Sequence, residues 1–152
     1  MSIHCVLYMH LNMHITIRVG YIRPLLEYAA PVWHSALTRS QTHQIERVQK
    51  RVLRLILGIQ YQTYKTALSL AQLETLCHRW IRLCLQFAQS LANSPQFSHW
   101  LPLNNVISRS LRNRKPFKEV MCKTERFKNS PISFLTRLLN NNQIQPALDQ
   151  LD

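Results

Sequence analysis

The chain has 152 residues, of which 46% are hydrophobic, and carries 19 Lys and Arg against 7 Asp and Glu for a formal net charge of +12. This length suits one domain, and the hydrophobic fraction excludes a wholly disordered chain. The excess of positive charge indicates a polyanionic partner.

The cysteines indicate a reducing compartment. They form no CxxC pair, and the N-terminus lacks the pattern of a signal peptide. We therefore expect reduced thiols in an intracellular protein, nuclear or cytoplasmic and not secreted. No window is apolar for long enough to cross a membrane, so no membrane partner is expected. The four cysteines are Cys5, Cys77, Cys84 and Cys122.

The first 20 residues are strand-like. Between residues 3 and 19, apolar side chains occupy the odd positions, and mostly polar side chains occupy the even ones. A period of two predicts a β-strand or hairpin.

From Tyr21 onward the pattern turns helical. Pro24 is tolerated in a first helical turn, whereas Pro31 is expected to kink or end that helix. Thr38 and Gln41 have capping-box spacing, so a new helix is predicted there, with Gly58 as its end. Its predicted core stripe is Ile45, Val48, Val52, Leu55 and Ile56, and the cations on roughly the opposite side are Arg47, Lys50, Arg51 and Arg54.

Residues 59–103 predict a short helical piece with a turn, then a long helix, then a loop. Tyr61, Tyr64, Leu68 and Leu70 mark the short piece, and Asn93-Ser94-Pro95 ends the long helix. The long helix has one apolar face, made of Leu73, Leu76, Cys77, Trp80, Cys84, Phe87, Ala88 and Leu91. The aperiodic residues Phe97, Trp100, Pro102 and Leu103 predict the loop.

The densest positive segment lies between residues 109 and 128, with a local charge of +6. Its cations are Arg109, Arg112, Arg114, Lys115, Lys118, Lys123, Arg126 and Lys128, against Glu119 and Glu125. A last helix is predicted from Ser133 to Leu139. The predicted fold is mainly α: a small helical bundle with an N-terminal strand or hairpin and a basic, loop-rich C-terminal part. We divide the chain into a leader (1–20), a helical domain (21–103), a basic linker (104–130) and a short helix with a polar tail (131–152).

Two segments resemble a known family. The stretch YIRPLLEYAAPVWHSALTRSQTHQIERVQKRVLRLILG, from Tyr21 to Gly58, resembles the region just downstream of the polymerase core in non-LTR retrotransposon reverse transcriptases, especially Jockey-like ones. The matching residues are Ile22, Arg23, Pro24, Leu26, Glu27, Tyr28, Pro31, Trp33, Ile45, Glu46, Val48, Gln49, Arg51, Arg54 and Gly58. Residues 59–101 follow the family in outline, and TERFKNSPISFLTRLLN, from Thr124 to Asn140, resembles its extreme C-terminus.

The resemblance implies the thumb and post-thumb fragment of an RNA-directed DNA polymerase, with a thumb-like helical domain that grips template and primer. Residues 1–20 depart from it, because the family is expected to be helical there. Either these residues come from unrelated sequence, or tertiary context overrides their pattern.

The carboxylates argue against catalysis. The family's reaction needs aspartates to hold two metal ions, and the first aspartate here is Asp149. The glutamates are scattered singly, which also argues against nuclease and RNase H activity. There is no GxSxG motif, and the chain has only two glycines, so phosphate-cradling loops are excluded and no cofactor or small-molecule substrate is expected. We predict a chain that is not an enzyme.

A zinc site is also not expected. In a strand, His10 and His14 would lie about 13 Å apart, too far to share one ion. Cys77 and Cys84 fall on the apolar stripe, where buried inert thiols are common.

The cations of both segments predict non-specific, salt-dependent contact with the RNA or DNA backbone. Four aromatic residues are candidates for stacking on unpaired bases, although such residues are more often core: Tyr61, Tyr64, Trp100 and Phe117. The alternatives are a solvated charged face, a host-adopted nucleic-acid binder, a decayed element product without selected function, and an interaction module that docks on a reverse transcriptase palm. In the last case, an exposed apolar patch is expected from Leu26, Tyr28, Val32 and Trp33.

Overall fold

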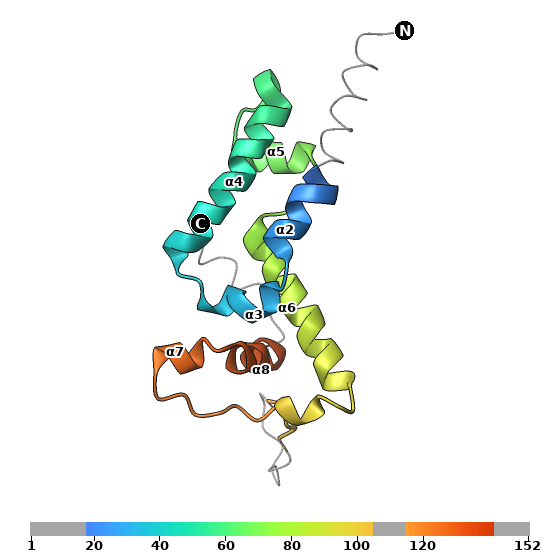
Figure 1. Ribbon diagram of the computed structural model, residues 1–152, viewed down its shortest axis with the longest axis vertical. Helices are drawn as coiled ribbons and strands as arrows, with labels where there is room; N and C mark the ends of the chain where they lie inside the picture. The colour runs from blue at the N-terminus through green and yellow to red at the C-terminus, as the bar shows by residue number, and fades with distance from the viewer. Residues whose placement is uncertain (1–17, 105–114, 142–152) are drawn as a thin grey trace. The chain divides into compact units, whose positions relative to one another are not determined.

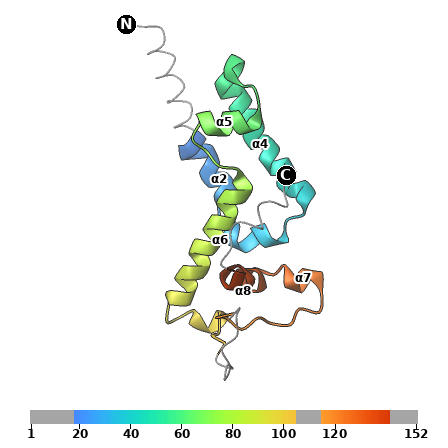
Figure 2. The same ribbon diagram turned by 180° about the vertical axis from the view of Figure 1, so that it is seen from behind.

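The computed structural model describes residues 18–104 and 115–141, and the mainly helical fold class predicted from the sequence is confirmed. The strand expected over residues 3–19 lies outside the described residues, apart from Arg18 and Val19. These two begin a π-helical turn, Arg18–Ile22, so the prediction is wrong for them. The chain divides into two compact units (Figures 1 and 2). Unit 1 holds the residues up to Ala29 and Thr38–Arg79, and unit 2 holds Ala30–Leu37 and the residues from Trp80 onward.

In unit 1, helix α2 (Arg23–Glu27) begins with a proline in its first turn, as predicted for Pro24. It ends because Tyr28 is not helical (φ −55°, ψ 124°) and Ala29 has a positive φ of 51°. The prediction that Pro31 kinks or ends this helix is therefore wrong. The helix stops before it, and Pro31 lies in the first turn of the next short helix, α3 (Ala30–Trp33), where its missing N–H costs nothing.

Helix α4 (Arg39–Leu57) has the ends that the sequence predicts. The Thr38 hydroxyl accepts a hydrogen bond from the Gln41 backbone N–H at 3.3 Å, and the Gln41 side chain accepts one from the Thr38 backbone N–H at 2.9 Å. This reciprocal pair satisfies two N–H groups that a bare helix end would leave unpaired. At the other end, Gly58 has a φ of 49°, which a residue without a Cβ adopts at little cost.

The buried face of α4 is not the predicted one. Glu46, Gln49, Leu53 and Leu57 are buried, whereas Val48 and Leu55 of the predicted stripe are exposed. At about 100° per residue, the helix is turned by roughly a third of a turn from the expected orientation. Two polar residues lie in its core face, and a hydrophobic pattern cannot find them.

The first core forms between α4 and α5 (Tyr64–Leu70), the predicted short helical piece. Leu53 and Leu57 pack there with residues of α5 and of the turn that follows it, namely Ala67, Leu68 and Ala71. Tyr61, Tyr64 and Leu73 cover its edge. Thr63 caps α5 through a second capping box with Thr66.

Helix α6 (Leu76–Asn93) begins in unit 1 and continues through unit 2, and it ends at the predicted Asn93. The predicted stripe is correct for five positions, which are buried: Leu76, Trp80, Cys84, Ala88 and Leu91. It is wrong for Phe87, which is exposed, while Ile81 is buried without having been predicted.

Unit 2 contains α3, α7 (Glu125–Lys128) and the predicted last helix, observed as α8 (Pro131–Asn141), together with two 3₁₀ turns, His34–Ala36 and Ser98–Trp100. Its core joins Cys84, Ala88 and Leu91 of α6 to Leu101 and to Leu135 of α8. Beside this core, Trp33 meets Trp80 edge-on at 5.1 Å between ring centroids. The His34 ring lies 5.4 Å from Trp80 and 5.9 Å from Phe134.

The predicted loop after α6 is held by an antiparallel bridge between Leu103 and Phe117. Asn104 N–H donates to Pro116 O at 2.8 Å, and Lys118 N–H donates to Pro102 O at 2.9 Å. The Asn140 side chain of α8 then hydrogen-bonds both the N–H and the C=O of Phe117, at 2.9 and 3.0 Å. The bridge thus joins the segment around Phe117 to the loop after α6, and Asn140 joins the same segment to the end of the last helix.

Candidate nucleic-acid interface

The four predicted cations of α4 share one flank of the helix. Arg47, Arg51 and Arg54 are exposed, and Lys50 is half-buried. The sequence pattern places this flank opposite the buried face. Because the helix is turned from its predicted orientation, the flank lies beside the buried face instead. The stripe still spans about 10 Å along the axis, at about 1.5 Å per residue.

Two of the four cations, Lys50 and Arg54, lie over aromatic rings. The Lys50 ammonium lies 4.8 Å from the centroid of the Tyr64 ring, and the Arg54 guanidinium lies 5.2 Å from the centroid of Tyr61. Such cation–π contacts are favourable and hold the long side chains in place. Both rings are half-buried and pack on the first core. Tyr61 and Tyr64, which the sequence suggested as stacking platforms for bases, therefore contact a cation of the protein itself.

The other two cations, Arg47 and Arg51, are exposed and form no ion pair within residues 18–104 and 115–141. They are four residues apart on one helix face, so their guanidinium groups can reach neighbouring phosphates. Like charges at this spacing disfavour the helix slightly. A bound polyanion removes that repulsion.

The direction in which the cationic flank of α4 faces depends on two buried polar residues of the helix. Glu46 accepts hydrogen bonds from the Tyr64 hydroxyl and, at 3.1 and 3.3 Å, from the backbone N–H of Leu76 at the start of α6. Gln49 donates from its side chain to Glu74 O at 3.0 Å. Both residues are inside the block that resembles the reverse transcriptases, which was the available signal for them. The hydrophobic pattern gave none.

A second set of charges explains two other residues of that block. Arg23 pairs with Glu27 within α2 and with Glu74 at 3.4 Å, while Arg79 pairs with Glu27 at 3.1 Å and with Glu74 at 4.0 Å. The four side chains alternate in sign around a ring and are largely buried. Arg23 and Arg79 are therefore neutralised within the fold, so they add nothing to a phosphate-binding surface.

The basic segment belongs to unit 2. Of its cations, Arg109, Arg112 and Arg114 lie outside the described residues. Two others pair with carboxylates: Lys115 with Glu119 at 2.8 Å and Lys128 with Glu125 at 3.4 Å. The hydrogen bond from Lys115 is the main cause that lowers the pKa of Glu119. The cations that are exposed and form no ion pair within the described parts of the chain are Lys118, Lys123 and Arg126.

The residues of the predicted palm-docking patch fall in both units. Leu26 and Tyr28 belong to unit 1, and Val32 and Trp33 to unit 2. Tyr28 and Val32 are exposed, whereas Leu26 is half-buried and Trp33 is half-buried against Trp80. Only two of the four are therefore open apolar surface.

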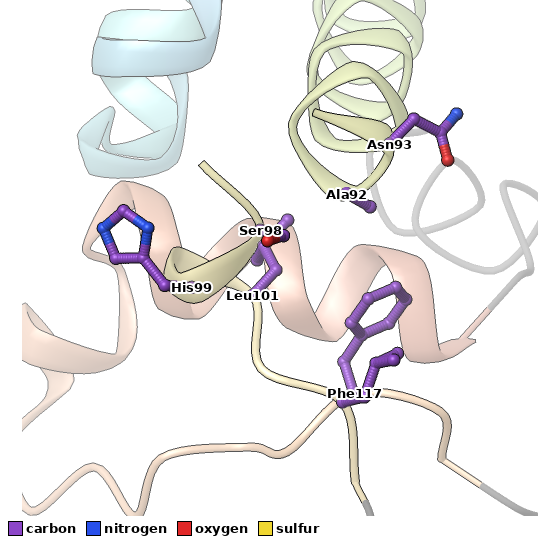
Figure 3. Close-up of a pocket in the computed structure, with 7 residues that line it drawn as sticks. Ala92, Asn93, Ser98, His99, Leu101 and Phe117 are labelled. Carbon is purple, nitrogen blue, oxygen red and sulfur yellow. The ribbon is translucent and has the colours of Figure 1, made fainter. Parts of the chain in front are cut away.

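Unit 2 also contains a pocket of about 470 Å³ at the end of α6 (Figure 3). Ala92 and Leu101 contribute apolar lining, and His99 contributes a polar group. The remaining lining residues are Asn93, Ser98, Leu103 and Phe117. The predicted stacking residue Phe117 is thus half-buried in a pocket wall, while Trp100 is exposed and its ring lies 5.3 Å from that of Phe97, tilted by 54°.

Nucleophiles and metal ligands are sparse in the described parts. Burial raises the pKa of Cys77 to about 11, with a further contribution from the charge of Glu46, and burial raises the pKa of Cys84 to about 12. Both thiols stay protonated near neutral pH and are poor nucleophiles. Within residues 18–104 and 115–141, no group of three or more His, Cys, Asp or Glu side chains could hold a metal ion, and no helix is long and apolar enough to cross a membrane.

Comparison with known proteins gives no relative: no family model, no curated protein and no solved structure matches this chain.

Proposed function

We propose that this chain binds the phosphate backbone of RNA or DNA through the exposed cations of α4, as the non-catalytic thumb and post-thumb fragment of a non-LTR reverse transcriptase. The observation that carries the proposal is the pair Arg47 and Arg51, exposed side by side and not neutralised by a described carboxylate. The net charge of +12 supports it, because a polyanion is attracted from a distance.

Binding of this kind is non-specific. Arginines that contact phosphates fix position but read no sequence. We expect weak affinity for RNA and DNA alike, falling steeply with salt as counterions are released. In the intact polymerase, the same face would hold nucleic acid next to the palm domain.

A fluorescence-anisotropy titration tests the proposal. The full chain is titrated into labelled single-stranded RNA and into a duplex, each at low and at raised salt. Arg51→Glu should weaken binding several-fold and reduce the slope of log affinity against log salt by about 1. Lys65→Glu is the matched control, since it makes the same change in net charge at an exposed position of α5 in the same unit.

Each of the following results would overturn the proposal. Absence of binding at low salt, or binding that does not respond to salt, excludes a backbone interaction. If Lys65→Glu weakens binding as much as Arg51→Glu does, only the total charge matters and α4 is not the site. Loss confined to one RNA sequence would contradict backbone-only contact.

A further inference from the structure

Helix α4 exposes a second apolar surface, separate from its core face. Val48 is 45% exposed, Leu55 is 77% exposed, and Ile59, just past the helix end, is fully exposed. Ile45 and Val52, between these residues and the core, are half-buried. We call these five residues the α4 strip. Two residues of the stripe that the sequence pattern assigned to the core, Val48 and Leu55, are therefore exposed in unit 1.

The spacing of the α4 strip is that of a helix-pairing seam. Within the helix, Ile45, Val48, Val52 and Leu55 follow one another at intervals of three, four and three residues. This is the repeat of the a and d positions of a coiled coil, where the side chains of one helix fill holes on another. These four residues cover about one and a half heptads, or about 15 Å at about 1.5 Å per residue, and Ile59 lies just beyond the helix end.

The fold explains why the α4 strip is left open. Glu46 and Gln49 fix the rotation of the helix, because their hydrogen bonds to Leu76 N–H and Glu74 O are made from the core face. Turning the strip inward would break these bonds and bury polar groups without partners, which is costly. The exposed strip is thus a fixed feature of unit 1.

Charge selects the kind of helix that fits. Arg51 follows Val48 by three residues and precedes Leu55 by four, so it lies beside both, and Arg47 lies one turn before it. A second copy of this chain would bring the same arginines and a net charge of +12 against them. A helix with acidic side chains along its flank would instead be attracted.

We propose that the α4 strip docks an amphipathic helix of a partner protein, with apolar residues at heptad a and d positions and Asp or Glu on the flank that faces Arg47 and Arg51. The strip is short, so the contact belongs to the small, transient class of interfaces. Because Arg51 also belongs to the phosphate-binding surface, the acidic helix and RNA compete for it. The apolar half of the contact is independent of that surface.

The experiment uses the full chain and a synthetic helical peptide of about 21 residues, with Leu and Ile at a and d and Glu at e and g. A second peptide carries Lys at e and g. Fluorescence anisotropy should show binding of the acidic peptide and about tenfold or more weaker binding of the basic one. Leu55→Gln should weaken acidic-peptide binding by about tenfold, while Leu70→Gln, at another exposed apolar position of unit 1, leaves it unchanged.

Two further readouts separate this proposal from the phosphate-binding one. Leu55→Gln should leave RNA affinity at the wild-type value, and circular dichroism checks that the variant keeps its helix content. Arg51→Glu should weaken both RNA and acidic-peptide binding.

Three results would overturn the proposal. One is equal affinity for the two peptides, and another is peptide binding that is unaffected by Leu55→Gln. The third is a dimer in sedimentation equilibrium that Leu55→Gln dissociates, which would assign the strip to a second copy of the chain.

Discussion

The carboxylate of Glu46 accepts hydrogen bonds through both of its oxygens from the backbone N–H of Leu76, at 3.1 and 3.3 Å. Leu76 is the first residue of α6, so a side chain of α4 satisfies a donor that would otherwise be unpaired at the start of another helix. The negative charge also lies at the positive end of the α6 dipole. The bond thus joins α4 to α6 through two residues that are 30 positions apart in sequence.

Replacing Glu46 should therefore destabilise unit 1. We expect Glu46→Ala to lower the free energy of unfolding by about 2–3 kcal/mol, because it leaves the Leu76 N–H and the Tyr64 hydroxyl without their acceptor. Tyr64→Phe should cost only about 1 kcal/mol, since the bonds from Leu76 remain. Urea denaturation followed by circular dichroism measures both. Equal losses for the two variants would show that the bonds from Leu76 contribute little.

Within the ring of four charged side chains, Glu27 and Arg79 should stabilise the fold jointly, with a measurable coupling free energy. A double-mutant cycle with Glu27→Gln and Arg79→Gln is expected to give about 1 kcal/mol, because these side chains are only 13% and 29% exposed. The pair of Glu125 and Lys128 is the control, since it is open to solvent and should give a coupling near zero. Raised salt should reduce the first coupling little. A first coupling that disappears at raised salt would mean that the ring acts as an ordinary surface pair.

His34 should make unit 2 sensitive to acid. Burial between Trp80 and Phe134 lowers its pKa from 6.5 to about 4 in the folded protein. As the pH falls, the unfolded chain takes up this proton first, so the stabilisation is complete above about pH 6.5 and is lost as the pH falls toward 4. Between about pH 7 and pH 5 the loss should be about 2 kcal/mol.

Tryptophan fluorescence during urea unfolding measures this effect, because Trp80 contacts the His34 ring. His34→Gln is the comparison, as it cannot titrate. The wild type should lose about 2 kcal/mol more than the variant over this pH range. Parallel pH profiles for the two proteins would refute the assignment.

The thiol of Cys77 should be alkylated slowly, and the rate of this reaction should depend on Glu46. Burial and the Glu46 charge raise its pKa to about 11, so little thiolate is present at about pH 8. Peptide mapping after iodoacetamide treatment should show Cys77 unmodified in the folded chain. Glu46→Gln should speed its alkylation, whereas Cys84, whose pKa is raised by burial alone, should not change in rate. An unchanged Cys77 rate would mean that burial alone protects it.

The sequence predicts the helix ends of this protein better than it predicts the faces. Thr38, Gln41 and Gly58 act through their immediate neighbours, so their roles can be read from spacing. The buried face of α4 depends on Glu46 and Gln49, whose partners are contributed by α5, by the loop before α6 and by the start of α6. No local pattern records such contacts, so the apolar stripe was assigned to the wrong side.

In the candidate site, too, local spacing predicts some features and tertiary contacts determine the others. That Arg47, Lys50, Arg51 and Arg54 share one flank follows from their spacing alone. That Lys50 and Arg54 lie over tyrosines, while Arg47 and Arg51 stay open, depends on where Tyr61 and Tyr64 are placed by the α5 packing. The sequence thus defines the set of cations, and tertiary structure decides which of them can bind a ligand.

The hydrogen bonds of Asn140 have a consequence for how unit 2 behaves in a crowded solution. A strand-like segment normally leaves a row of unpaired backbone groups at its edge, where another chain can add a strand and begin aggregation. Phe117 has neither group open, because the Asn140 amide occupies both its N–H and its C=O. A single side chain therefore leaves no backbone group of Phe117 open for strand pairing with another chain, a protection that other proteins obtain from a bulge, a proline or an additional strand.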